Sequence, residues 1–352
     1  MSDISQNQRR SPWPLITREL RMTRVNVITG FLGCGKTTTL RHLLANKPAQ
    51  ERWAILVNEF GEIGIDGALL ADSGAQLKEI PGGCMCCVNG LPMQIGLNML
   101  LKTQPDRLLI EPTGLGHPTQ ILRLLESEVY SAWLTLQATL CLLDARQLND
   151  ARLQNNENFR DQLAAADIIV ANKIDTYDDD ARDALRRWQQ AQGDERTLLE
   201  TQRGQIDPAW LDRPRARTAA LPEARHHHAP SAPASGIAAL RLRPGQGWRR
   251  ALNQGQGYFS CGWVFSEESI FDTIGLLEWV RLTPLLRIKG AVRVAEGTLC
   301  VNRQGADLQI ETRQTPPPDS RIEVIHDAEA DWNALQSALL ALRTRRQETS
   351  TI

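Results

Sequence analysis

The stretch from Gly30 to Thr37 constrains this chain more than any other. Its letters, GFLGCGKT, fit the pattern G-x-x-x-x-G-K-[ST], in which backbone N–H groups cradle phosphate oxygens. The apolar residues 25–29 precede it and predict a buried strand, and residues 38–44 predict the start of a helix, whose N-terminus carries partial positive charge. A glycine-rich turn can match the pattern by chance, but a strand, a loop and a helix in this order favour a true phosphate loop.

Two side chains of this loop carry the expected chemistry. Lys36 can reach the β and γ phosphates of a nucleotide, and the Thr37 hydroxyl can ligate Mg²⁺. Cys34 lies where the backbone would wrap the phosphates, and we interpret its side chain as a small filler rather than a ligand.

Composition limits the partners to expect. A length of 352 residues suggests two domains, and a formal net charge of −1 argues against non-specific attraction to nucleic acid or an anionic membrane. The sequence lacks an apolar run of membrane-spanning length, and residues 1–21, which we interpret as a disordered extension, lack the apolar core of a secretory signal. Seven cysteines in such a chain indicate free thiols in a reducing cytoplasm.

Strands alternate with helices over residues 22–202, which we take as the first domain. This alternation predicts an α/β fold with a doubly wound, mostly parallel sheet, whose ligands gather at the carboxyl ends of the strands. The expected strands lie at 25–29, 53–57, 75–80, 107–110, 138–143 and 167–171. The expected helices lie at 38–44, 91–101, 117–126, 159–165 and 181–192.

The character of the chain changes after this domain. Residues 203–235 are punctuated by prolines and are interpreted as a linker. Within it, the run 226–228 of three histidines could raise the local metal concentration or be a solvated stretch without a role. Residues 236–347 predict a smaller α+β domain with an antiparallel sheet, with helices at 270–282 and 328–345. Its expected strands lie at 237–242, 258–265, 286–294, 298–302, 308–312 and 321–325.

The run Asn172-Lys173-Ile174-Asp175 follows a buried strand and is a second nucleotide signal. The Asp175 carboxylate can accept hydrogen bonds from guanine N1–H and its 2-amino group, whereas adenine would leave that carboxylate unpaired. Asn172 would contact the other edge of the base, and the stem of Lys173 would pack over the ring. A polar turn between a strand and a helix is the alternative interpretation.

Glu111-Pro112-Thr113-Gly114 takes the place of the acid-x-x-Gly segment of nucleotide switches. Glu111 can hold Mg²⁺ through water, and the Gly114 N–H can sense the γ phosphate, so that hydrolysis releases the loop. A turn that merely ends a strand is the alternative. The loop lacks the early lysine of deviant ATPase loops, which disfavours ATP-driven partitioning or targeting.

Three of the cysteines, Cys84, Cys86 and Cys87, fall within four residues after a Pro-Gly-Gly bend. Thiolates suit Zn²⁺ and Cu(I), and three local thiolates leave an incomplete shell, which suits a metal that is held and then passed on. The missing ligand could come from one of three residues, Glu59, Glu62 or His117. A redox thiol cluster or coincidental surface cysteines are the alternatives.

Five segments in this order, GFLGCGKTT, NEFGE, GGCMCC, EPTG and NKID, resemble the CobW-type P-loop GTPases, and within them a zinc metallochaperone branch. The pattern spans residues 23–175, and the chain from about 237 resembles the C-terminal domain of that family more loosely. The resemblance implies a GTPase that binds Zn²⁺ and delivers it to a zinc-dependent client protein, with the change from GTP to GDP timing the handover.

The resemblance also implies roles for residues of this sequence. The phosphate site comprises Gly33, Cys34, Gly35, Lys36, Thr37 and Thr38. Lys36, Thr37 and Glu111 would serve catalysis, with Thr37 and Glu111 holding Mg²⁺. Gly114, Asn172, Lys173 and Asp175 complete the nucleotide site. The zinc site that the resemblance implies comprises Cys84, Cys86 and Cys87. For the fourth ligand, which the resemblance leaves open, we choose Glu62 among the three candidates.

We expect bound GTP·Mg²⁺ to order residues 58–66 and 111–116 and so to assemble the cysteine site between them. Intrinsic hydrolysis should be slow, because the sequence does not identify an internal arginine finger. A nucleotide-gated zinc sensor or store, a cobalamin-pathway accessory GTPase that handles cobalt, a kinase and a redox protein remain alternatives. The sequence leaves open the client, Co²⁺ or Ni²⁺ as the cellular metal, and the assembly state, with a homodimer among the options.

Overall fold

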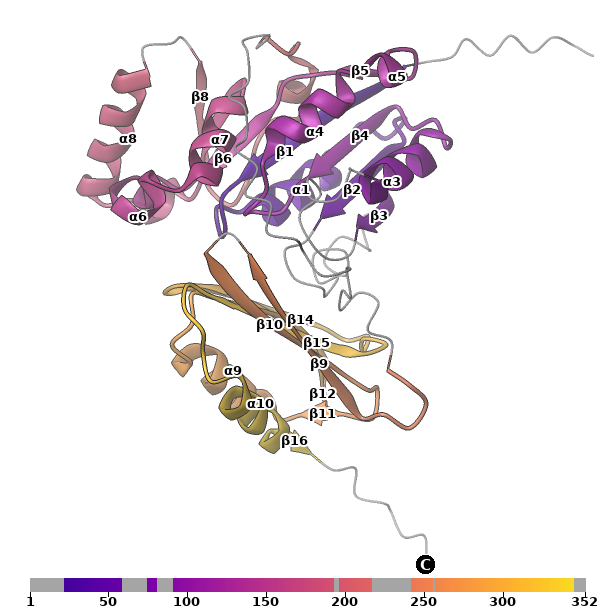
Figure 1. Cartoon of the computed structure of the whole chain (residues 1–352), viewed down its shortest axis with the longest axis vertical. Coiled ribbons are helices and arrows are strands. Elements are labelled where there is room, and N and C mark those ends of the chain that lie inside the picture. Colours follow the sequence, from indigo (N-terminus) through magenta and orange to yellow (C-terminus); the bar gives the residue numbers. More distant parts are fainter. Residues whose placement is uncertain are drawn as a thin grey trace, which may run out of the picture.

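The computed structural model describes residues 22–58, 75–80, 91–192, 196–216, 242–255 and 257–344. They form two domains, drawn one above the other in Figure 1. Each domain is built on its own sheet. The predicted limits of the domains, and of the N-terminal extension and the linker, stay predictions.

The first domain is built on a sheet whose paired strands are all parallel. The strand order is β3-β2-β4-β1-β6-β7-β8, and β5 pairs with the start of β1. This confirms the predicted doubly wound parallel sheet. The strands are β1 (Thr23–Gly30), β2 (Trp53–Asn58), β3 (Gln76–Ile80), β4 (Arg107–Glu111), β5 (Leu134–Leu136), β6 (Leu140–Leu143), β7 (Ile168–Ala171) and β8 (Thr197–Glu200).

Helices cover both faces of this sheet (Figure 1), because its strands are apolar on both sides. On β4, Leu108 and Ile110 enter one core, and Leu109 enters the other with Leu40 and Leu43. The α-helices are α1 (Lys36–Ala45), α3 (Leu91–Leu101), α4 (Pro118–Leu125), α5 (Glu128–Ser131), α6 (Ala151–Gln154), α7 (Glu157–Ala165) and α8 (Asp179–Gln192). The 3₁₀ turns are η2 (Ala145–Asn149), η3 (Ile174–Thr176) and η4 (Pro208–Asp212).

The described part of residues 203–235 begins as a packed segment of the first domain. Ile206 and Leu211 are buried in the core that covers one face of the sheet. The Arg107 guanidinium, at the start of β4, donates to the Leu211 carbonyl oxygen at 3.0 Å and to Asn26 Oδ1 at 2.6 Å. Residues 203–216 are therefore held to the sheet, whereas residues 217–241, with the histidine run, lie outside the described residues.

The second domain has an antiparallel sheet in the order β14-β13-β12-β15-β10-β9. Short β11 pairs with β12 in parallel and with β16 antiparallel. The elements are β9 (Trp248–Gly255), β10 (Tyr258–Phe265), β11 (Ile270–Phe271), α9 (Thr273–Leu282), β12 (Arg287–Val294), β13 (Gly297–Gln304), β14 (Asp307–Arg313), β15 (Ser320–His326), α10 (Trp332–Ala341) and β16 (Arg343–Thr344).

Both helices of this domain begin later than predicted, at an aspartate that caps them. Asp272 Oδ1 accepts from the Gly275 N–H, so α9 begins at Thr273, and Ile270–Phe271 pair as a strand instead. Asp331 Oδ1 likewise accepts from the N–H groups of Asn333 and Ala334. None of the helices in the described ranges combines the length and apolar composition that crossing a bilayer requires.

The second sheet has one apolar and one polar face, since side chains alternate along its strands. Ile288, Leu299 and Val324 enter the core beneath α9 and α10. Their neighbours Arg287 and Glu323 line a pocket on the opposite face. That polar face is turned toward the first domain, and α9 and α10 lie on the far side (Figure 1).

Candidate nucleotide site

A pocket lies between the carboxyl edge of the first sheet and the polar face of the second. The first domain contributes Gly33, Gly35, Lys36, Thr37, Thr38, Glu111, Thr113, Gly114 and Lys173. The second domain contributes Arg287, Asn302, Gln304, Asp307, Gln309 and Glu323. The two predicted nucleotide segments therefore meet in one place, and the second domain forms the other wall.

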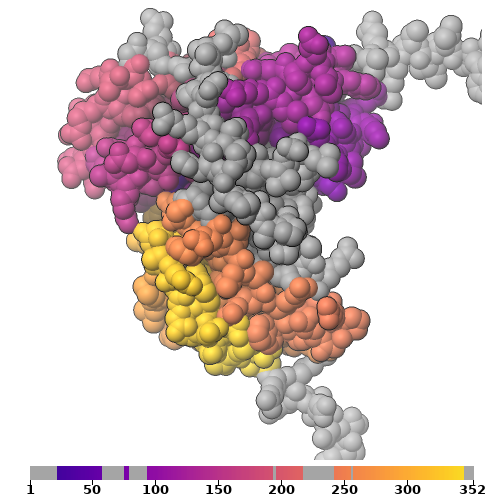
Figure 2. All heavy atoms as spheres, viewed as in Figure 1, coloured from indigo at the N-terminus to yellow at the C-terminus, as the bar shows by residue number. Residues whose placement is uncertain are grey.

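Beside this pocket the domains make apolar and ionic contacts. Phe31, in the glycine-rich loop, lies with its ring centroid 6.4 Å from that of Tyr258, and Ile325 is buried in the same cluster. Farther out, Arg152 of α6 pairs with Asp327 at 2.8 Å. Figure 2 shows the pink part of the first domain meeting the yellow part of the second.

A left-handed glycine and a buried lysine define the glycine-rich loop. Gly35 caps α1 with a φ of 101°, a left-handed conformation that favours glycine, and a Cβ there would strike the Asn172 amide nitrogen. Lys36 is buried, and its Nζ donates to the carbonyl oxygens of Gly30 at 2.8 Å and Phe31 at 3.3 Å. A Cβ placed on Gly114 would lie 3.0 Å from Lys36 Nζ, so this ammonium group stands beside the predicted γ-phosphate sensor.

Cys34 is fully buried beneath the loop. Burial raises the pKa of its thiol, so the side chain stays neutral at physiological pH. A buried neutral thiol fills space and does not present a thiolate to a ligand, which agrees with the interpretation of Cys34 as a filler.

Asn172 joins the two nucleotide segments through its side chain. Its Nδ2 donates to the Cys34 carbonyl oxygen at 2.8 Å, and its Oδ1 accepts from the Gly204 N–H at 2.9 Å. Asn172 thus braces the phosphate loop against the loop after β8, in addition to any contact with a base. Gly204 was not among the predicted site residues, although its place just after a strand of the sheet could have indicated it.

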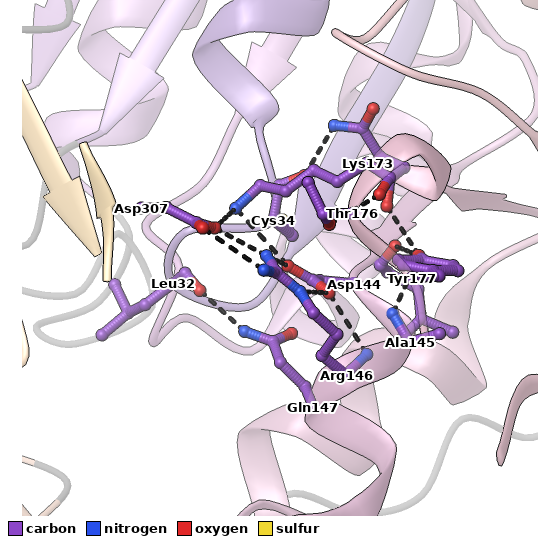
Figure 3. Close-up of polar contacts among 12 residues, drawn as sticks. Leu32, Cys34, Asp144, Ala145, Arg146, Gln147, Lys173, Thr176, Tyr177 and Asp307 are labelled. Carbon is purple, nitrogen blue, oxygen red and sulfur yellow. Dashed lines mark hydrogen bonds and ion pairs between the residues drawn. The ribbon is translucent and has the colours of Figure 1, made fainter. Parts of the chain in front are cut away.

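Lys173 lies in a cluster of four charged side chains that spans both domains (Figure 3). Its Nζ is 2.9 Å from Asp307 Oδ2 and 3.4 Å from Asp144 Oδ2. Arg146 pairs with the same two carboxylates, each at 2.6 Å. Hydrogen bonds from Arg146 and Lys173 lower the pKa of Asp307 to about 2. The sequence does not single out Arg146 or Asp307, which become neighbours of Lys173 only through the fold.

Asp175 lies on η3, just after Lys173 turns the chain with a φ of 66°. Its side chain is exposed to solvent. An exposed carboxylate at this edge of the sheet can receive a base that enters from solvent, but its role as the guanine reader stays a prediction.

Glu111 ends β4 inside the pocket and is the buried acid of the site. Its Oε2 accepts no hydrogen bond from any described residue. Burial raises the pKa of Glu111 to about 7, against the opposing charges of Lys36 and Arg287. An orphaned carboxylate oxygen near Thr37 fits a divalent cation, so Glu111 and Thr37 together suit the predicted Mg²⁺.

Comparison with known proteins decides the family. The model of the CobW/HypB/UreG nucleotide-binding domain matches residues 24–200, and that of the cobalamin synthesis protein cobW C-terminal domain matches residues 260–343. The chain belongs to the CobW family. This confirms the family predicted from the ordered motifs, including its C-terminal domain.

This CobW-family chain is similar to proteins named as zinc chaperones. It is 62% identical over 323 residues to the zinc chaperone YeiR of Escherichia coli (strain K12), covering 92% of this chain and 98% of that protein. It is 36% identical over 158 residues to the zinc chaperone YjiA of the same organism, covering 43% of this chain and 49% of that one. It is 31% identical over 215 residues to the zinc chaperone CobW of Sinorhizobium sp, covering 53% and 60%.

The predicted zinc ligands of this CobW-family chain lie outside the described residues, since Glu59, Glu62, Cys84, Cys86 and Cys87 fall within 59–74 and 81–90. His117, the alternative fourth ligand, precedes α4, and its Nδ1 lies 2.6 Å from Asp161 Oδ2. Among the described residues, His, Cys, Asp and Glu side chains do not form a group of three or more that could hold a metal ion. The predicted zinc site therefore stays a prediction.

Proposed function

We propose that this chain is a GTP-hydrolysing zinc chaperone, which binds Zn²⁺ at Cys84, Cys86 and Cys87 with Glu62 and passes it to a client protein under control of the GTP or GDP state. The observation that carries the nucleotide half is the Asn172 bridge between the phosphate loop and the loop after β8. Because Asn172 belongs to the predicted base segment, its bond to the Cys34 carbonyl oxygen joins that segment to the phosphate loop, and residues suited to a guanine base and to a phosphate group lie side by side.

At the phosphate end of the pocket, different residues would bind the phosphates and the Mg²⁺ ion. Loop N–H groups and the α1 N-terminus would hold the phosphates, and Lys36 would leave the Gly30 carbonyl oxygen to reach the β and γ phosphates. Mg²⁺ held by Thr37 and Glu111 would neutralise charge that develops on the phosphates. Glu111 would lose its proton as the cation binds, because the buried carboxyl is largely neutral below pH 7.

The zinc half is supported by the chemistry of the cysteine triplet and by the name of the relative that is 62% identical over 92% of this chain. Three neighbouring thiolates suit Zn²⁺ and leave its shell incomplete. The triplet lies in sequence between β2 and β4, two paired parallel strands whose carboxyl ends lie at the edge of the sheet where the nucleotide would bind. If GTP tightens zinc binding, zinc must tighten GTP binding by the same factor.

A zinc titration of the full chain tests this proposal. The titration is done with a GTP analogue, with GDP and without nucleotide, against a fluorescent zinc chelator of known affinity. We expect zinc affinity to differ by about tenfold or more between the GTP-analogue and GDP states, within the usual range of coupling between sites. Equal affinity in the three states would refute nucleotide control of the metal.

A matched pair of variants assigns the zinc ligands in the same assay. Replacing Cys84, Cys86 and Cys87 together by serine should abolish the tight zinc site. Cys300→Ala, in a buried cysteine of β13 far from the triplet in sequence, should leave it unchanged. Zinc that stays bound through hydrolysis and never passes to the chelator would instead favour the sensor or store alternative.

A further inference from the structure

Arg287 brings a cation from the second domain into the phosphate end of the pocket. It is the first residue of β12, where it lies opposite Gln304 of β13 and Ile325 of β15. Its side chain lines the same pocket as Lys36, Glu111 and Gly114. These three residues form the part of the site at which the γ phosphate is expected, because Gly114 is the predicted γ-phosphate sensor and Glu111 the Mg²⁺-side acid.

The position of Arg287 follows from the alternation of β12. Ile288 and Val292 point into the core beneath α9 and α10, so Arg287 lies on the opposite, polar face. The first domain covers that face at this end of the strand, where Ile325 is buried against its apolar cluster. The guanidinium is therefore held toward the glycine-rich loop by a strand in the middle of a sheet, which is a rigid support.

Among the described residues that line this pocket, Arg287 is the cation left without a partner. Lys36 donates to loop carbonyl oxygens, and Lys173 pairs with Asp307 and Asp144. The Nε of Arg287 is buried and finds no hydrogen-bond acceptor in the described part of the chain. A buried unpaired donor costs free energy, and a phosphate oxygen entering the pocket would satisfy it.

The guanidinium does have an electrostatic neighbour. Burial raises the pKa of the nearby Glu111 carboxyl, and the positive charge of Arg287 lowers it. The two groups nevertheless make no ion pair within 4.0 Å. Arg287 thus lies close to Glu111, the acid that would hold Mg²⁺, but its guanidinium is not paired with that carboxylate. An arginine offers a fixed fork of donors, and one that is unpaired and lines the pocket beside the glycine-rich loop is placed to act as an arginine finger supplied within one chain.

We propose that Arg287 donates hydrogen bonds to the γ phosphate of bound GTP and stabilises the charge of the transition state, so that the second domain completes the hydrolytic site. This rests on the proposed function as a GTPase. In the reaction, a water oxygen bonds to the γ phosphorus as the bond from phosphorus to the β–γ bridging oxygen breaks. The electron pair of the broken bond stays on GDP, the proton of water passes to the phosphate, and Arg287 is unchanged.

The sequence alone does not identify an internal arginine finger, because Arg287 reaches the pocket only through the docking of the two domains. With this role for Arg287, the second domain takes part in catalysis. Hydrolysis would require the two domains to be docked as they are here, because Arg287 and Lys36 come from different domains. A partner that parts the domains would then slow hydrolysis without touching the glycine-rich loop.

The test uses the full chain with Arg287→Ala and Arg287→Lys, and Arg249→Ala as the matched control. Arg249 is an arginine of the same sheet, on β9, and it does not line the pocket. Single-turnover GTP hydrolysis is measured with Mg²⁺, together with GDP affinity and capture of the transition-state mimic GDP·aluminium fluoride. A folding check by circular dichroism accompanies each variant.

We expect Arg287→Ala to lose about 100-fold or more in the hydrolysis rate and to lose aluminium fluoride capture, with GDP affinity within about threefold of the wild type. Arg287→Lys should recover only part of the rate, because an ammonium lacks the fork, and Arg249→Ala should match the wild type. Wild-type hydrolysis and capture in a folded Arg287→Ala variant would overturn the role of Arg287 alone. A wild-type chain that binds no guanine nucleotide would overturn the proposed function and the role of Arg287 with it.

Discussion

Asp307, in the second domain, lies 2.9 Å from the ammonium group of Lys173, in the first. The same carboxylate pairs with Arg146, so one side chain of β14 holds two cations of the nucleotide domain (Figure 3). This carboxylate thus links the two domains where both of them line the pocket. Its removal should therefore loosen the docking of the domains.

We predict that Asp307→Asn lowers the free energy of unfolding by about 1 kcal/mol, because the side chain is about one-third exposed and solvent screens its ion pairs. The pKa of Asp307 falls from 3.8 to about 2 on folding, so this stability is present above pH 3.8 and is lost as the pH falls toward 2. Urea unfolding at several pH values measures it. Asp327→Asn, which breaks the exposed pair with Arg152, serves as the control and should change stability by less.

Glu111→Gln should stabilise the nucleotide-free, Mg²⁺-free protein at high pH. The folded pKa of about 7 exceeds the unfolded value of 4.5, so the native state holds an extra proton between these values and stability falls as pH rises through that window. The difference corresponds to about 3 kcal/mol at pH 8, and glutamine removes it. Thermal and urea unfolding should show the two proteins equally stable near pH 4.5.

The exposed Glu267→Gln is the control for that comparison and should follow the wild type at every pH. Hydrolysis should fall in Glu111→Gln despite its greater stability, since a neutral amide cannot hold Mg²⁺ as a carboxylate does. A variant that is no more stable than wild type at pH 8 would show that the Glu111 carboxylate already has a partner.

Asp175→Asn should exchange guanine for xanthine as the preferred base. Xanthine replaces the 2-amino donor of guanine by a carbonyl oxygen, which an asparagine N–H can serve and an aspartate cannot. We expect GTP affinity to fall by about 100-fold and XTP affinity to rise, measured by competition against a fluorescent GDP. Asp179→Asn, at the start of α8, is the control. An unchanged preference for GTP would place the base elsewhere.

Leu211→Ala should destabilise the first domain by about 2–4 kcal/mol, because Leu211 of η4 is fully buried in the core that covers one face of the sheet. Leu282→Ala, at the exposed end of α9, should stay within about 0.5 kcal/mol of the wild type. Urea unfolding distinguishes them. Equal stability of the two variants would mean that residues 203–216 do not pack on the sheet in solution.

Most strands of the first domain were predictable because they are short, mainly apolar runs, and each nucleotide segment follows one of them, but β5 (Leu134–Leu136) and β8 (Thr197–Glu200) were not among the expected strands. β9 was not predicted because its sequence, Trp248–Gly255, is polar, with two arginines, an asparagine and a glutamine. The prolines near Leu211 suggested a linker, although the segment around Leu211 is packed on the first domain. Buried Arg107 holds that segment by contacts with residues about a hundred positions away. Periodicity in a local window does not report such partners.

The residues of the candidate site also fall into those that the sequence predicted and those that it did not. Lys36, Glu111, Gly114 and Asn172 lie in motifs whose chemistry is local, and the fold brings all four to the carboxyl edge of one sheet. Arg287 and Asp307 lie in ordinary strand sequence and enter the site only because the second domain docks there. Their part depends on the placement of one domain against another, for which a single sequence offers no pattern.

A Cβ placed on Gly33 would collide with the side chain of Gln304, so β13 roofs the glycine-rich loop at close range. A phosphate group seated on that loop has protein above it as well as below it. We expect a bound nucleotide to leave only when β13 moves away from the glycine-rich loop. Its residence time would then be set by how often the two domains separate. A partner that separates the second domain from the first would then act as a nucleotide exchange factor.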